Sequence, residues 1–201
     1  MDVPSSLQIT LIMSFKKHIS LLEDAIPNGK NLEIFENISR FLAQDILEAA
    51  SKKKLICIFG NGGSAADSSH WSTELVASYE NRSRKAIPVI SLSDSLPTIT
   101  AIANDVNYEN VFTRQIDAYA NNLGLAIGLS TSGQSKNVLN ALDKSLSYNA
   151  KTYLVTGNKY KNIGKYSNEV IFDSSHVGTI QTLTQIFYHS VCNEVERIID
   201  N

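Results

Sequence analysis

Residues 55–67 read LICIFGNGGSAAD, a run of continuous apolar residues that ends in a glycine-rich turn. Apolar runs without apolar–polar alternation are typical of parallel strands that helices cover on both faces. Similar runs alternate with helical segments along the rest of the chain, and strands are expected at Leu55–Phe59, Ala86–Leu92, Leu125–Leu129, Lys151–Val155 and Glu169–Phe172. This alternation predicts an α/β fold with an open, parallel, five-stranded sheet flanked by helices.

The first 51 residues follow a helical period instead. Apolar residues recur at helical spacing on either side of a turn at residues 27–29: Leu7, Leu11, Phe15, Ile19 and Leu22, then Phe35, Ile38, Leu42 and Ile46. They predict two amphipathic helices, whose apolar stripes must pack on the remaining domain, on another subunit, or on both. We therefore divide the chain into an N-terminal helical extension, residues 1–51, and one domain, residues 52–201, that together form one structural unit.

The composition is that of an ordinary globular protein, with 201 residues of which 43% are hydrophobic and 19% charged. A net charge of -2 provides no basic field for nucleic acid. The longest apolar runs are far shorter than the roughly 20 residues that cross a membrane. The only cysteines, Cys57 and Cys192, predict neither a disulfide framework nor a metal-binding cysteine pair. We expect a cytoplasmic protein whose partners include neither nucleic acid nor a membrane.

The first candidate binding loop is Gly60–Ser64, which joins the first strand to a helix. Glycines at such a turn let backbone N–H groups approach an anion, and the N-terminus of a helix favours negative charge. A phosphate or a sugar hydroxyl can bind there, at Asn61, Gly62, Gly63 and Ser64. Taken alone, the loop is equally compatible with a tight turn in which Ser64 caps the helix.

The second candidate loop, residues 130–135, follows the third strand and reads STSGQS. Its four hydroxyls, on Ser130, Thr131, Ser132 and Ser135, exceed what a helix cap requires, although an ordinary serine-rich loop is the simpler alternative. Hydroxyls and backbone amides at a helix N-terminus can bind phosphate. Because the carboxyl ends of parallel strands meet at one edge of a sheet, both loops are predicted to line one crevice.

Two pairs of polar residues on the predicted helices are candidate metal ligands. They are His70 with Glu74, four residues apart on one helix face, and Gln181 with His189, eight residues apart and about 80° around the axis. Imidazole and carboxylate at such spacing can bind one metal ion, although each pair alone is more typical of surface residues or of a buried histidine with its own partners. His18 is predicted to lie at the surface, and His176 is a weaker alternative ligand.

Taken in order, the two loops, His70, Glu74, Ala103–Asp105, Gln181 and His189 resemble the sugar isomerase (SIS) domain family, and within it the phosphoheptose isomerases. The resemblance covers nearly the whole chain. It implies a homotetramer with active sites at subunit interfaces. It also implies an activity that converts sedoheptulose 7-phosphate to D-glycero-D-manno-heptose 7-phosphate, at the start of bacterial heptose synthesis.

The resemblance further assigns residue roles. It implies one zinc ion per subunit, bound by His70, Glu74, Gln181 and His189, and it makes Glu74 and His189 the catalytic acid/base pair. It implies substrate contacts at Asn61, Gly62, Gly63, Ser64, Glu74, Asn104, Asp105, Ser130, Thr131, Ser132, Ser135 and Gln181. Such roles suit an enediol reaction, which needs a base for the carbon-bound proton and an acid for the oxygens. A divalent cation can polarise the carbonyl or be mainly structural.

The chain departs from the family pattern in three places, and none is a metal ligand. The Arg and Glu that commonly flank the Ile–Gln pair of the last helix are Thr179 and Thr182 here, Gly178 precedes them, and Ala66 replaces a polar residue of some members. Two other classes share the domain: a non-catalytic adaptor that binds the replication initiator and lacks the catalytic glutamate, and a transcription regulator with a preceding DNA-binding domain. Glu74 argues against the adaptor, which remains the alternative, and the two N-terminal helices argue against the regulator.

Overall fold

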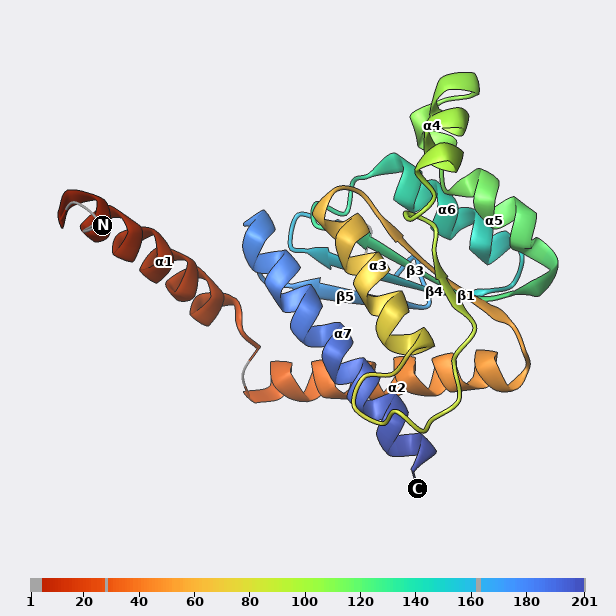
Figure 1. Cartoon of the computed structure of the whole chain (residues 1–201), viewed down its shortest axis with the longest axis horizontal. Helices are drawn as coiled ribbons and strands as arrows, with labels where there is room; N and C mark the ends of the chain where they lie inside the picture. The colour runs from red at the N-terminus through yellow and green to blue at the C-terminus, as the bar shows by residue number, and fades with distance from the viewer. Residues whose placement is uncertain (1–4, 28, 162–163, 201) are drawn as a thin grey trace.

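A parallel β-sheet of five strands forms the centre of the molecule, in the order β2-β1-β3-β4-β5 (Figure 1). The computed structural model describes residues 5–27, 29–161 and 164–200. The strands are β1 Leu55–Gly60, β2 Val89–Ser91, β3 Leu123–Ser130, β4 Lys151–Gly157 and β5 Asn168–Phe172. The predicted fold class is confirmed.

Helices cover both faces of this sheet. They are α1 Ser5–Ala25, α2 Gly29–Ser51, α3 Gly63–Val76, α4 Leu96–Asp105, α5 Thr113–Tyr119, α6 Lys136–Ser147 and α7 Val177–Ile199, with short 3-10 helices η1 Tyr108–Asn110 and η2 Ala120–Asn122. Successive residues of β1 point to opposite faces. Ile56 and Ile58 therefore join the core under α2, α3 and α7, whereas Cys57 and Phe59 join the core under α5 and α6.

The edge strand β2 is shorter than predicted, because it covers Val89–Ser91 rather than Ala86–Leu92. Pro88 cannot donate a backbone hydrogen bond to a sheet. Its carbonyl still accepts from Ile56 N at 2.9 Å, but the residue before it, Ile87, donates to Leu75 O at the end of α3. The segment before Pro88 therefore belongs to the loop that follows α3.

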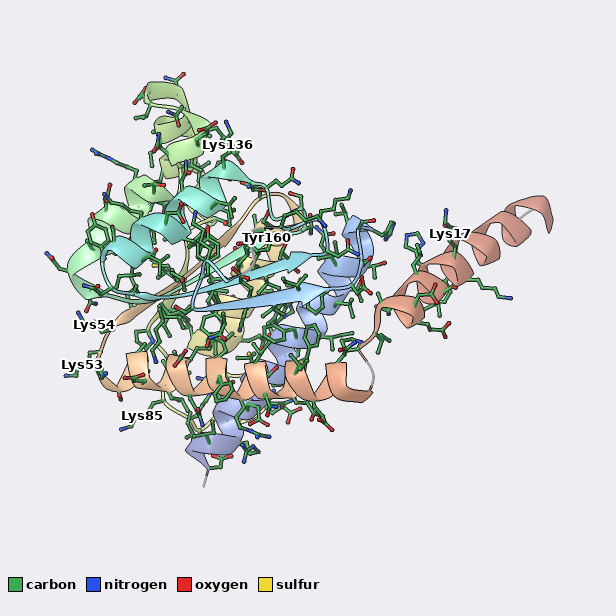
Figure 2. All side chains as sticks on the ribbon, turned by 180° about the vertical axis from the view of Figure 1, so that it is seen from behind. Lys17, Lys53, Lys54, Lys85, Lys136 and Tyr160 are labelled. Carbon is green, nitrogen blue, oxygen red and sulfur yellow. The ribbon has the colours of Figure 1, made fainter. Side chains whose placement is uncertain are left out.

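The two N-terminal helices are present as predicted, but they differ in how they pack. Helix α2 packs on the sheet and on α7 as part of the domain. Its apolar side chains are fully buried in the same core as those of α7: Leu42, Ala43 and Ile46. In contrast, α1 extends away from the rest of the molecule (Figure 1), and Lys17 lies far from the other labelled side chains (Figure 2). Phe15 of α1 is 72% exposed, so part of its apolar stripe is uncovered in a single chain.

Two expectations about the protein's class can be compared with the structure. Cys57 and Cys192 are both free and buried, as expected for residues outside a disulfide framework. Across the described part of the chain, every helix is too short or too polar to cross a membrane.

Candidate active site

Hydrogen bonds join the glycine-rich turn after β1 to the first turn of α6. Because β1 and β3 are neighbours in the sheet, the loops that follow them begin side by side at its carboxyl edge. Asn61 and Asn137 exchange two side-chain hydrogen bonds of 2.9 Å each. The Tyr108 hydroxyl donates to Asn61 Oδ1 at 2.8 Å. The two predicted loops therefore lie together, and Asn61 is held in place from both sides.

The turn itself needs glycine at two positions. Gly62 has φ 55°, a conformation that L residues with a Cβ rarely adopt. A Cβ on Gly63 would lie 2.0 Å from Gln181 Nε2, so the side chain of Gln181 reaches across from α7 to this turn. Gly62 occupies the N-cap position of α3, and Ser64 is buried inside the first helical turn. The interpretation of Ser64 as the helix cap is therefore wrong.

The serine-rich loop surrounds the N-terminus of α6 with hydroxyl groups. Ser130 Oγ donates to Ser135 Oγ at 3.0 Å, and Gln134 N donates to Ser132 Oγ at 3.2 Å. Gly133 has φ 65°, and a Cβ there would lie 2.6 Å from Tyr160 Cβ, so the loop is packed closely against its neighbour. Hydroxyls next to a helix N-terminus make this loop chemically suited to bind a phosphate group.

A second polar cluster lies where α3 packs on α7. His70 Nε2 is 3.0 Å from Glu74 Oε1, and the rings of His70 and His189 are 5.4 Å apart. The structure thus brings together three of the four candidate metal ligands. Gln181 instead contacts Gly63, which lies seven residues before His70, or about 10 Å along α3 at 1.5 Å per residue.

Two tyrosines that the sequence analysis did not single out frame the histidines of this cluster. The Tyr188 hydroxyl is 2.7 Å from His70 Nδ1, and Tyr79 stacks on His189 with ring centroids 5.1 Å apart. Burial raises the pKa of Tyr188, so its hydroxyl stays protonated. Burial, and next the neighbouring His70, lower the pKa of His189, against an opposing effect of the Glu74 carboxylate. Both effects favour the neutral imidazole of His189.

The other predicted residues lie apart from this cluster. Asn104 Nδ2 donates to Asp105 Oδ1 at 2.8 Å, and both side chains are exposed at the end of α4. Nδ1 of His176 accepts from Thr179 N at 3.2 Å and so caps α7, which gives His176 a structural role. His18 is exposed as expected, and its ring lies 5.6 Å from that of His176.

The donor set fits zinc in type but is not gathered at one point in a single chain. Imidazole and carboxylate are zinc ligands, and the contact from Tyr188 to Nδ1 of His70 leaves Nε2 directed at Glu74, an arrangement typical of a supported metal ligand. Within residues 5–27, 29–161 and 164–200, however, no three His, Cys, Asp or Glu side chains are arranged to hold one metal ion, and this includes the neighbours His70, Glu74 and His189.

Comparison with known proteins identifies the domain. The sequence pattern of the SIS domain family matches residues 16–157. A phosphoheptose isomerase from Helicobacter pylori (strain P12) is 37% identical over 84% of this chain and 88% of its own length. The chain belongs to the SIS domain family, in its phosphoheptose isomerase group. A probable phosphoheptose isomerase from Thermoplasma volcanium is similarly related to this SIS domain, at 35% identity over 77% of the chain and 79% of its own.

Solved structures agree with the SIS fold. A phosphoheptose isomerase from Neisseria gonorrhoeae superimposes with a TM-score of 0.77 at 24% identity, covering 95% of this chain and 99% of the other. One from Francisella tularensis gives a TM-score of 0.78 at 21% identity, with coverage of 96% and 99%. These likenesses show that the described chain has the same fold.

Proposed function

We propose that this protein is an aldose–ketose isomerase that converts D-sedoheptulose 7-phosphate to D-glycero-D-manno-heptose 7-phosphate, the first step of bacterial heptose biosynthesis. The observation that carries the proposal is the contact between Glu74 and His70, with His189 beside them, in a chain that also has a hydroxyl-rich loop suited to phosphate. The relatives named as phosphoheptose isomerases support the same activity. Nothing in the described part of the chain favours the adaptor alternative.

The chemistry follows from the residue types. Glu74 acts as the base that takes a proton from carbon 1 of the ketose and returns it to carbon 2, so that an enediol forms between the two transfers. His189, whose neutral form is favoured, moves a proton between the oxygens of the same two carbons. Ser130, Thr131, Ser132 and Ser135 hold the phosphate through hydroxyls and the amides at the start of α6, and Asn61, Gly62 and Gly63 face the sugar.

We further propose that the protein assembles as a homotetramer in the cytoplasm, with each active site built from more than one subunit. Glu74 is eleven residues into α3 from Gly63, about 16 Å along the helix, which exceeds the length of a seven-carbon sugar phosphate. We infer that a second chain supplies the Glu74 cluster to a substrate held by the loops of the first. The uncovered side chain of Phe15 on α1 supports such assembly.

We also propose one zinc ion per subunit, held by His70, Glu74, Gln181 and His189. Because Gln181 lies about two helical turns from His70 in one chain, its contribution requires the same assembly. Bound zinc would supply a positive charge that stabilises the developing enediolate. Metal analysis of the purified protein, with His189→Asn as the matched variant, tests this directly: the variant is expected to hold less zinc, and an unchanged zinc content would contradict His189 as a ligand.

The activity is tested by incubating the purified protein with sedoheptulose 7-phosphate and following the aldose phosphate by NMR. Wild-type protein is expected to form the aldose, and Glu74→Gln, which keeps the side-chain volume but cannot act as a base, is expected to form none. Turnover is measured with and without a chelator. Absence of product from the folded, zinc-loaded wild-type protein would contradict the proposal.

A further inference from the structure

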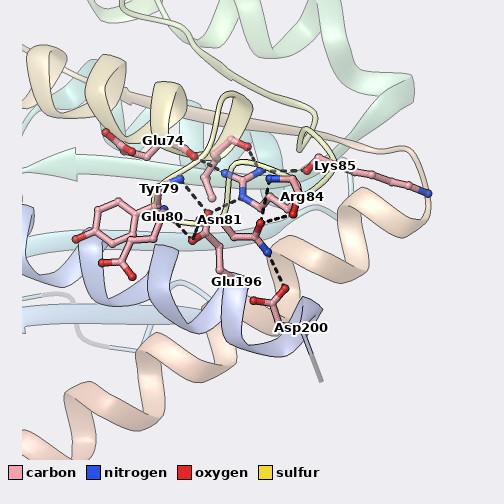
Figure 3. A network of polar contacts seen from close by, with 10 residues as sticks. Glu74, Tyr79, Glu80, Asn81, Arg84, Lys85, Glu196 and Asp200 are labelled. Carbon is pink, nitrogen blue, oxygen red and sulfur yellow. Dashed lines mark hydrogen bonds and ion pairs between the residues drawn. The ribbon is translucent and has the colours of Figure 1, made fainter.

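Glu196 of α7 holds the loop that follows α3 through its backbone. Its side chain is 7% exposed, and both carboxylate oxygens have partners (Figure 3). Oε1 accepts from Tyr79 N at 2.9 Å, while Oε2 accepts from Glu80 N at 2.9 Å and Asn81 N at 2.8 Å. Three consecutive backbone N–H groups of a loop are thus bound to one carboxylate of a helix.

Arg84 holds the other end of the same loop. Its side chain is 1% exposed, and its Nε donates to Glu196 Oε1 at 2.9 Å. Nη1 donates to Leu75 O at 2.8 Å, and Nη2 donates to Glu74 O (Figure 3). A guanidinium at the C-terminus of a helix binds carbonyls that have no partner within the helix. We call Arg84 and Glu196 together the clamp.

The clamp bonds the backbone of Glu74 directly and reaches His189 through Tyr79. Arg84 fixes the backbone of Glu74, and Glu196 fixes the backbone of Tyr79, whose ring stacks on His189. His189 and Glu196 are seven residues apart on α7, which is within about 20° of two full turns, so both face α3 and its loop. Glu196 binds the backbone of Tyr79 on the same face of α7 that carries His189. The half-buried ring of Tyr79 therefore lies against His189.

We propose that Tyr79 is a positioning residue, whose ring, held by the clamp, sets the orientation of the His189 imidazole for proton transfer. This inference rests on the function proposed above. His189 is enclosed on its remaining sides by Tyr188, with ring centroids 4.7 Å apart, and by His70. Tyr79 is the member of this enclosure that comes from a loop rather than a helix, so its placement depends on the clamp and not on the helix backbone.

The test compares Tyr79→Leu, which removes the ring, with Tyr79→Phe, which keeps it. Tyr148→Leu is the matched control, because Tyr148 is also half-buried and directly follows another helix, α6. For each variant, kcat, KM and the unfolding midpoint are measured with sedoheptulose 7-phosphate. The protein is also labelled at histidine Cε1 with carbon-13, and since the chain has only 4 histidines, the His189 signal is assigned by comparison with His189→Asn.

If Tyr79 positions His189, Tyr79→Leu lowers kcat about 10- to 100-fold while KM changes less than about twofold, because misorientation affects the transition state more than binding. The His189 signal shifts in Tyr79→Leu and stays near its wild-type position in Tyr79→Phe, which also keeps wild-type kcat. The unfolding midpoint of Tyr79→Leu falls no further than that of Tyr148→Leu. If Tyr79→Leu does not fold, Tyr79→Met takes its place.

Three results would overturn the inference. They are a wild-type kcat in Tyr79→Leu, an unshifted His189 signal in that variant, or losses of activity and midpoint that are equally large in Tyr79→Phe. A wild-type protein without isomerase activity would instead contradict the proposed function, and the His189 signal would still show whether Tyr79 controls the imidazole.

Discussion

Replacing Glu196 by Gln is expected to destabilise the protein by about 3 kcal/mol at neutral pH. Burial raises the pKa of Glu196, but the N–H groups of Asn81 and Tyr79 and the Arg84 guanidinium together lower it further, from 4.5 to about 2. At about 1.4 kcal/mol per pH unit, this lowering corresponds to about 3 kcal/mol of stability that depends on the charged carboxylate. Gln keeps the shape of the protonated acid and so removes that contribution.

The sign of the pH dependence follows from the lowered pKa. The contribution of Glu196 is fully present above the unfolded pKa of 4.5 and is lost as the pH falls toward the folded value of about 2. Urea denaturation is therefore measured from pH 7 to pH 2.5 at one protein concentration, because assembly makes stability depend on concentration. The wild-type and Glu196→Gln curves are expected to differ most at pH 7 and to approach each other below pH 4.5.

Glu48→Gln is the matched control, because the Lys151 and Lys52 ammonium groups also lower the pKa of Glu48 to about 2. The Glu48 side chain is 46% exposed, so water and salt screen its ion pairs. Replacing Glu48 is expected to lower the free energy of unfolding much less, and this loss disappears in high salt. The loss caused by replacing Glu196 persists in high salt. If both variants lose the same free energy of unfolding, burial does not strengthen the interactions of Glu196, and the reasoning fails.

Three further predictions concern the proposed site and its assembly. Glu74→Gln is expected to lower kcat at least 100-fold, on the order of a lost general base, with an unchanged size-exclusion profile; a near wild-type rate would exclude Glu74 as the base. Ser132→Ala removes one phosphate hydrogen bond and is expected to raise KM about 10-fold with little change in kcat, so a normal KM would contradict its assignment. Phe15→Glu places a charge on the exposed stripe of α1 and is expected to reduce the mass measured by light scattering, while circular dichroism stays that of a folded chain; an unchanged mass would show that α1 does not contribute to assembly.

The strands and the two loops could be predicted because each depends on local sequence. A continuous apolar run such as LICIFG has few alternatives to a buried parallel strand, and glycines after such a run indicate a turn into a helix. The errors have equally local causes. Pro88 shortened β2, and α3 begins two residues earlier than a serine cap at position 64 would allow.

The clamp and the tyrosines around the histidines could not be predicted, because each contact joins segments far apart in the chain. Arg84 and Glu196 are separated by 112 residues, and Tyr188 and His70 by 118. Arg84, Glu196 and Tyr188 have no distinctive local pattern, and the spacing of His70 with Glu74 gives no hint of Tyr188. One signal was available: Glu196 follows His189 by seven residues, a spacing that places both on one helix face. This spacing predicts an inward-facing Glu196 only after the structure has shown that His189 faces inward.

The distribution of the site residues in one chain and the exposed stripe of α1 have a common physical explanation. Along α3, Gly63 and Glu74 are about 16 Å apart, and the buried ion pair of the clamp fixes the Glu74 end against α7 and so opposes a closing motion within one chain. The proposed assembly lets one chain bind the substrate's phosphate while another supplies the groups that act on its carbonyl. Such an arrangement requires stable contacts between copies, and an apolar helix that extends from the body, as α1 does, provides a surface for them. Loss of assembly is therefore expected to abolish turnover even when every residue of the clamp and of both loops is intact.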